Sequence, residues 1–71
     1  MKLTGSIAFR DVEAGVWVLE GDDGRTYELA GGDRGIKKHG RRVEVEGDVD
    51  ARAVSISMVG PILRVMRYRF L

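Results

Sequence analysis

The sequence predicts an all-β protein, and within that class a small β-barrel. Residues 16–29 form two β-prone runs joined by a turn rich in Asp and Gly, which is the pattern of a β-hairpin. Residues 41–49 alternate apolar and charged side chains, as expected of a strand with one buried and one solvated face. The only segment with helix signals, residues 30–40, contains four glycines and has room for a turn or two.

The length and composition predict a single domain spanning residues 1–71. The chain has no Cys, so a secreted disulfide scaffold and a thiolate metal site are both excluded. The N-terminus has no apolar signal region, and no apolar run approaches the ~20 residues needed to cross a bilayer. We therefore expect a soluble, cytoplasmic protein without a membrane partner.

The charges are distributed unevenly along the chain. The net charge is only +1, but residues 1–33 hold 3 basic and 7 acidic side chains, whereas residues 34–71 hold 9 basic and 4 acidic ones. Residues 34–43 and 51–71 contain no acid at all. A basic patch is expected if these two segments meet on one face.

The first strand is expected from Lys2 to Arg10, because Leu3, Ile7 and Phe9 fall on one side and smaller residues fall on the other. Gly5 interrupts the alternation, which favours a bend where a long strand curls around a barrel. A turn over residues 11–15 follows.

The hairpin is apolar on both faces, so its register stays open between two alternatives. A two-residue turn would pair Val18 with Leu29 and would direct Trp17 outward. A three-residue loop would pair Leu19 with Leu29 and would group Trp17 with Tyr27 in the core. We favour the core position because large aromatic side chains are more often buried than displayed.

In the connection that follows, Asp33 is a good N-cap for a short helical turn, and Gly40 is a residue type that commonly follows a helix end. Ile36 is the apolar residue of this connection, and we expect it to cover the open end of the barrel. The next strand, residues 41–49, directs alternate residues inward: Val43, Val45, Gly47 and Val49.

A further strand is expected over residues 53–58. Pro61 marks the start, or an edge position, of the final strand, because it lacks a backbone donor. Leu63 and Val65 are its expected core residues.

This order of elements, with the pattern Gly40-x-x-Val43-x-Val45-x-Gly47-x-Val49, resembles the OB-fold over roughly residues 3–65. The chain looks most similar to small stand-alone bacterial OB-fold-like proteins of uncharacterised function. The resemblance implies a five-stranded Greek-key barrel that binds oligonucleotides or oligosaccharides on strands two and three. The short helical turn between strands three and four departs from the usual longer helix, and an SH3-like barrel remains the alternative.

Catalysis is not expected, and neither is a cofactor or a metal. The serines lie in strand patterns without a nearby base, and His39 is the only histidine. A lone His near a helix end more often satisfies the last carbonyl groups than binds a metal. The acidic residues of the turns fit hairpin loops better than calcium sites.

The first functional hypothesis is weak binding of single-stranded DNA or RNA on the strand 2–3 face, where aromatic side chains would stack on bases. Glu20 and Glu28 argue against it, because they flank the same aromatics. The candidate residues are Trp17, Arg25, Tyr27, Lys37, Lys38, Arg41 and Arg42.

The alternative hypothesis is a module that binds another protein, or itself, through its C-terminal strand and has no nucleic-acid role. The end of the chain alternates cations and aromatics without an acid, in the order Arg67, Tyr68, Arg69 and Phe70. Arg and Tyr are enriched at protein interfaces as well as in nucleic-acid sites.

Overall fold

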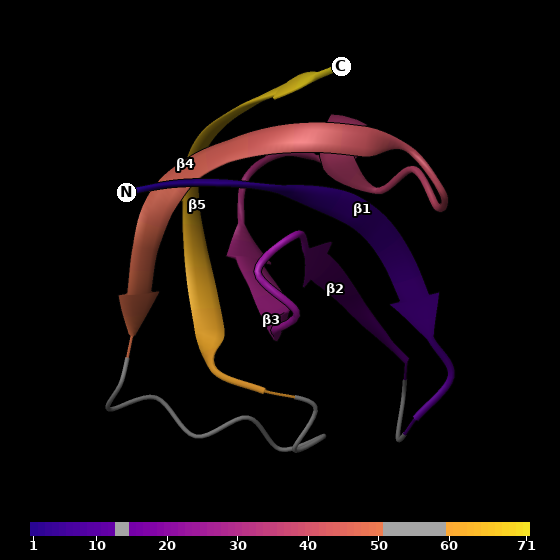
Figure 1. Cartoon of the computed structure of the whole chain (residues 1–71). Helices are drawn as coiled ribbons and strands as arrows, with labels where there is room; N and C mark the ends of the chain where they lie inside the picture. The colour runs from indigo at the N-terminus through magenta and orange to yellow at the C-terminus, as the bar shows by residue number, and fades with distance from the viewer. Residues whose placement is uncertain (13–14, 51–59) are drawn as a thin grey trace.

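The computed structural model describes residues 1–12, 15–50 and 60–71, and it contains one closed five-stranded barrel (Figure 1). The elements are β1 (Lys2–Arg10), β2 (Val16–Gly21), β3 (Thr26–Gly31), the 3-10 turn η1 (Arg34–Ile36), β4 (Arg42–Asp50) and β5 (Ile62–Phe70). This architecture confirms the predicted fold class, an all-β barrel with one short helical turn between the third and fourth strands.

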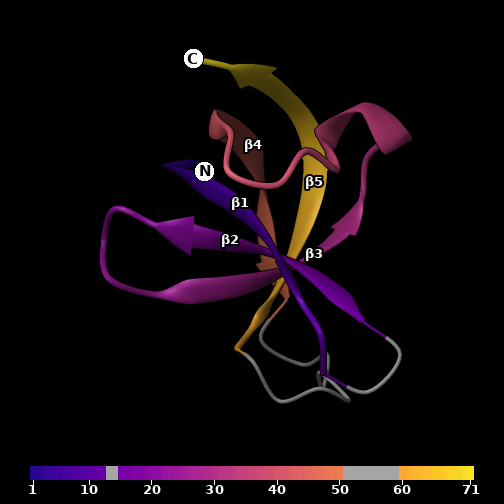
Figure 2. The same ribbon diagram turned by 90° about the vertical axis from the view of Figure 1, so that its right-hand side faces the viewer.

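The strands follow the order β1-β2-β3-β5-β4 around the barrel. The first three form an antiparallel meander, and β1 also pairs with β4. β5 lies between β3 and β4, parallel to the former and antiparallel to the latter. The connection from β3 to β4 crosses one end of the barrel, and η1 lies in this connection (Figure 2).

The bend predicted in β1 allows this strand to pair on both sides. Gly5 lies opposite Gly21 of β2 and also opposite Val43 of β4. A Cβ atom on Gly5 would lie 2.3 Å from the carbonyl oxygen of Glu20, so no side chain fits at this crossing. The glycine therefore permits the close approach at which the barrel wall turns.

The β2–β3 hairpin has a three-residue loop, because the Gly21 N–H donates to the Arg25 carbonyl at 2.8 Å. The predicted pairing was wrong in both alternatives: Leu19 lies opposite Tyr27, not Leu29. The preferred face was right, since Trp17 is half-buried and packs against the core.

β4 spans nearly the predicted residues, with Val43, Val45 and Gly47 buried and Val49 half-buried. A register shift opposite β5 occurs between Glu46 and Gly47. The strand predicted over residues 53–58 lies outside the described residues.

The buried core draws on every strand and on η1. Ile36 is 1% exposed and joins the core cluster, which confirms its predicted role as a plug. The other members are Ile7, Leu19, Tyr27, Val43, Val45, Leu63 and Val65.

Candidate nucleic-acid interface

The segment that closes the barrel end, residues 33–41, is called the plug segment here. Asp33 begins it as an N-cap, because its carboxylate accepts a hydrogen bond from the Gly35 N–H at 2.8 Å. The helical turn ends at Lys37, whose N–H donates to the Arg34 carbonyl at 3.1 Å. The predicted helix end at Gly40 was therefore wrong: only three residues are helical, and Gly40 instead takes a positive φ of 85° in the following turn.

The second half of the plug segment is hydrogen-bonded to β1. The Gly40 N–H donates to the Ile7 carbonyl at 2.7 Å, and the Ile7 N–H donates to the Arg41 carbonyl at 2.9 Å. His39 Nδ1 accepts a hydrogen bond from the Phe9 N–H at 2.9 Å. The expected role of His39 was therefore wrong, because the ring accepts a strand donor and does not satisfy helix carbonyls.

A side-chain contact ties the start of the plug segment to β5. The Tyr68 hydroxyl donates a short hydrogen bond to Asp33 Oδ1. This bond, together with the one from the Gly35 N–H, lowers the pKa of the Asp33 carboxyl below its usual value. The same contact raises the pKa of Tyr68, since the phenol must stay protonated to donate. The plug segment is thus fixed to β1 at one end and to β5 at the other.

Four cations project from the plug segment into solvent: Arg34, Lys37, Lys38 and Arg41. Arg41 lies over the Phe70 ring, with 4.6 Å between its guanidinium carbon and the ring centroid. Within the described part of the chain, none of the four has a carboxylate at ion-pairing distance. The one acid of the segment, Asp33, already accepts the two hydrogen bonds described above. The segment therefore presents net positive charge.

An aromatic pair lies beside this positive surface. Phe9 is 43% exposed and packs edge-to-face on Trp17, with ring centroids 5.2 Å apart. The backbone hydrogen bond from Phe9 to His39 places the Phe9 residue directly next to the plug segment. Trp17 is half-buried beneath this rim, on the side of β2 that faces the core.

Tyr27, the other predicted stacking residue, is only 3% exposed. Its hydroxyl donates to Asp23 Oδ2 at 2.7 Å, while Asp23 Oδ1 accepts from the Arg25 N–H at 2.9 Å. These bonds lower the pKa of Asp23, with the backbone N–H of Arg25 contributing most, and the first of them raises the pKa of Tyr27. The ring has no free face, so a base cannot stack on it in this arrangement.

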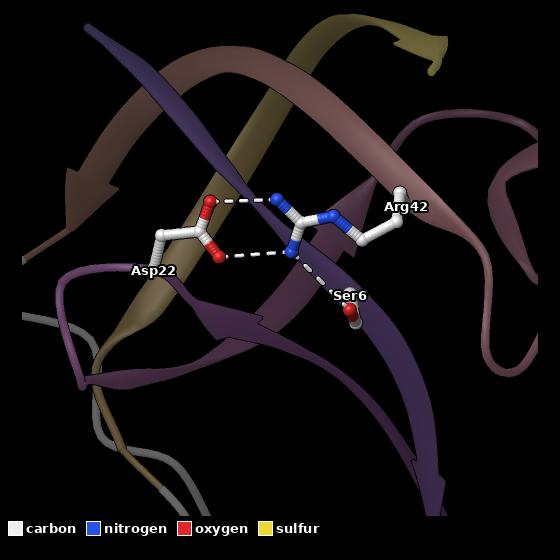
Figure 3. Close-up of polar contacts among 3 residues, drawn as sticks. All are labelled: Ser6, Asp22 and Arg42. Carbon is white, nitrogen blue, oxygen red and sulfur yellow. Dashed lines mark hydrogen bonds and ion pairs between the residues drawn. The ribbon is translucent and has the colours of Figure 1, made fainter.

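Arg25 and Arg42 do not join the plug cations. Arg25 lies in the loop between β2 and β3. This hairpin loop lies on the opposite side of the barrel from η1 (Figure 2). Arg42 binds Asp22 through two parallel hydrogen bonds of 2.7 and 2.8 Å, and it also donates to Ser6 Oγ at 3.4 Å (Figure 3). This pairing lowers the pKa of Asp22, so Arg42 joins β4 to the hairpin turn.

The sides of β2 and β3 that face away from the core present no aromatic residue. By strand alternation from the inward Leu19 and Tyr27, they carry Val16, Val18, Glu20, Thr26, Glu28 and Ala30. Of these six side chains, Glu20 is exposed and Val18 is fully buried. Of the predicted site, the structure therefore brings together Lys37, Lys38 and Arg41, with Trp17 below Phe9 nearby.

Sequence reasoning missed Phe9 and Arg34 as members of this surface. Arg34 carried a usable signal, because it begins the acid-free run of residues 34–43. Phe9 was predicted only to share one side of the first strand with Leu3 and Ile7, and its place near the end of β1 leaves it at the barrel rim.

On β5 the cations and the aromatics of the C-terminal pattern point to opposite sides. Arg67 and Arg69 face solvent and pair with glutamates of β4. Tyr68 and Phe70 pack against the core and against each other, with ring centroids 5.6 Å apart.

Among residues 1–12, 15–50 and 60–71, no three His, Cys, Asp or Glu side chains gather in a way that would hold a metal ion. The same residues include no helix long and apolar enough to cross a membrane.

Residues 10–65 match the family described as "Protein of unknown function (DUF5818)". The chain belongs to this family. The match includes the whole plug segment and ends within β5, before Arg67. Comparison with curated proteins and with solved structures gives no match.

Proposed function

We propose that this DUF5818 protein is a non-catalytic module that binds single-stranded nucleic acid at the plug end of its barrel. The observation that carries the proposal is the set of four exposed cations that have no carboxylate partner among the described residues, next to Phe9, which is 43% exposed and bonds to His39 through its backbone. Cations neutralise the phosphate backbone, and an exposed aromatic ring stacks on a base of any sequence. Tyr27 and Arg25 are not part of this interface.

We also propose that the barrel is an OB-fold rather than an SH3-like barrel. The strand order β1-β2-β3-β5-β4 and the helical turn between β3 and β4 support this assignment. OB-folds bind oligonucleotides with one strand face and the loops beside it. In this chain the proposed contact lies at the plug segment and not on the outward sides of β2 and β3, because the latter carry Glu20 and no aromatic residue. A cytoplasmic location is part of the same proposal.

The test is the salt dependence of binding to fluorescein-labelled oligo-dT, measured by fluorescence anisotropy. The logarithm of the association constant falls linearly with the logarithm of the salt concentration, and each phosphate contact to a single strand contributes about −0.7 to this slope. Four contacts therefore give a slope of roughly −2.8. The Lys37→Gln/Lys38→Gln variant removes two contacts and is expected to weaken the salt dependence to a slope of roughly −1.4.

The matched control is Lys2→Gln/Arg64→Gln, which removes two exposed cations far along the chain from the plug segment. This control is expected to keep the parental slope. Phe9→Leu retains an apolar side chain above Trp17 but removes the stacking ring, and it is expected to weaken binding by the stacking contribution of about 1–3 kcal/mol. Absence of binding at low salt, or equal effects of the two double variants, would disprove the proposal.

A further inference from the structure

The C-terminal half of β5 has one edge that no other strand covers in the described structure. β3 pairs with β5 only over residues 62–65, whereas β4 pairs with β5 as far as Phe70. The end of β5 forms the top of the molecule in both views (Figures 1 and 2). The strand edge from Met66 to Phe70 is called the free edge here.

The ladder with β4 determines which backbone groups face outward. The Leu71 N–H donates to the Arg42 carbonyl at 3.0 Å. Hydrogen-bonded residues alternate along an antiparallel strand, so the backbone groups of Arg69 and Arg67 face β4. The N–H and C=O groups of Tyr68 and Phe70 therefore face the free edge. Such a row of unpaired groups is a template for another strand.

Two cations stand on the outward side of this edge. The side chains of Arg67 and Arg69 are 77% and 71% exposed, although each is paired. Arg67 Nε lies 3.1 Å from a carboxylate oxygen of Glu46, and Arg69 Nε lies 3.3 Å from one of Glu44. Both contacts use Nε, so the terminal nitrogens of each guanidinium keep their donors for another carboxylate.

Charge decides between the occupants that this edge could accept. In a symmetric antiparallel pairing of two copies centred on Tyr68, Arg67 of each copy would lie opposite Arg69 of the other. Like charges directly opposite one another destabilise a strand pair. An acidic strand would be attracted instead, because two carboxylates spaced two residues apart would lie opposite Arg67 and Arg69. β4 already makes this arrangement on the other side of β5 with Glu44 and Glu46.

We propose that the free edge binds an extended acidic segment of a partner protein by strand addition. Main-chain hydrogen bonds to Tyr68 and Phe70 supply the pairing, and ion pairs with Arg67 and Arg69 select carboxylates at alternate positions. This binding is independent of the nucleic-acid function proposed above.

The test uses a fluorescein-labelled peptide of alternating Glu and Val, with binding to the full chain measured by anisotropy. Saturable binding is expected, and Arg67→Gln/Arg69→Gln is expected to weaken it about tenfold. The matched control is Arg64→Gln. Arg64 lies on the same strand and pairs with Asp50, but Ala30 of β3 covers its edge, so binding is expected to remain unchanged.

Two N-methylated peptides separate strand addition from simple charge attraction. One peptide carries methyl groups on the backbone nitrogens of its even-numbered residues, and the other carries them on the backbone nitrogens of its odd-numbered residues. Only one of these sets faces β5 in a strand pair, so one peptide is expected to lose binding and the other to retain it. A peptide with Lys in place of Glu is expected not to bind.

Several results would overturn the proposal: no saturable binding, equal losses with both methylated peptides, or the same loss in the Arg64→Gln control. Concentration-dependent dimers in sedimentation velocity that the peptide dissociates would assign the edge to a second copy. Displacement of the peptide by oligo-dT would assign the arginines to nucleic acid. The Lys37→Gln/Lys38→Gln variant is expected to keep peptide binding, so this proposal and the proposed function can fail separately.

Discussion

Replacement of Ile36 by Ala is expected to destabilise the protein severely, because among the described residues this is the side chain of the plug segment that joins the buried core cluster. Ile36 is 1% exposed and is the only apolar residue between Ala30 and Val43. The substitution removes three buried carbon groups at about 0.8 kcal/mol each, and the cavity left behind raises the loss to about 3–4 kcal/mol. Native domains have roughly 0.05–0.15 kcal/mol of stability per residue, hence about 4–11 kcal/mol for 71 residues.

The assay is urea denaturation followed by the fluorescence of Trp17, with far-ultraviolet circular dichroism as a second probe. Ile36→Val provides the graded control, since it removes one carbon group and is expected to cost about 0.5–1.5 kcal/mol. Met66→Ala provides the exposed control, because Met66 is 69% exposed and its loss is expected to change the unfolding free energy by less than about 0.5 kcal/mol.

The outcome also bears on the proposed interface. Ile36→Val is expected to retain oligo-dT binding, because the turn that carries Lys37 and Lys38 stays docked on the barrel. A loss below about 1 kcal/mol for Ile36→Ala would refute the reasoning, since it would mean that the plug contributes no more than a surface residue.

Three further predictions concern other contacts. Gly47→Ala is expected to cost more than about 2 kcal/mol in urea denaturation, because the new Cβ atom would lie 2.0 Å from a β5 carbonyl oxygen. Tyr27→Phe is expected to cost about 1 kcal/mol in the same assay through loss of the hydrogen bond to Asp23, and an unchanged midpoint would contradict this role. The Asp33–Tyr68 contact is expected to stabilise the fold between two pH limits. The pKa of Asp33 is lowered from 3.8, so its contribution is present above that value and is lost as the pH falls below it. The pKa of Tyr68 is raised from 10.0, so its contribution is present below that value and is lost as the pH rises above it. Thermal melts against pH test both limits, and Tyr68→Phe is expected to flatten the two responses.

The strands were predictable because their signals are local. β1 begins and ends where the alternation places it, and β4 differs from its predicted range by one residue at each end. Gly5 indicated the bend, because a glycine inside a strand pattern commonly marks a bend or a close approach of another backbone. These properties depend on neighbours along the chain, which a sequence displays directly.

The hairpin register was not predictable because side chains of the turn set it. Asp23 bonds to both the Arg25 N–H and the Tyr27 hydroxyl, which closes a three-residue loop. The Asp-Gly pair of the sequence suggested a tighter turn equally well. With apolar residues on both faces of β2, the pattern offered no second criterion.

The members of the basic surface were predictable only in part, because ion pairing depends on barrel closure. Arg42 looked equivalent to Arg41 in the sequence. However, β4 pairs with β1 at Ser6, and this brings Arg42 to Asp22, twenty positions away along the chain. Arg41 points instead toward Phe70 and has no carboxylate partner among the described residues. Adjacent cations thus acquire opposite roles through alternation and one distant contact.

A barrel of this size leaves few places for a binding site. The inward positions of its strands are occupied by the core, since Ile7, Leu19 and Leu63 are each 1% exposed or less. Several arginines on the outer wall of the barrel form ion pairs with carboxylates of neighbouring strands, as Arg10 does with Glu20. Surface pairs of this kind add little stability, but they neutralise the charge that would otherwise attract a polyanion to the wall. The positive charge without a carboxylate partner in the described structure then belongs to the plug segment, whereas the free edge of β5 keeps unpaired backbone groups because a neighbouring strand is missing there. Both candidate surfaces therefore follow from the same cause: binding capacity is left wherever the barrel does not pair its own groups.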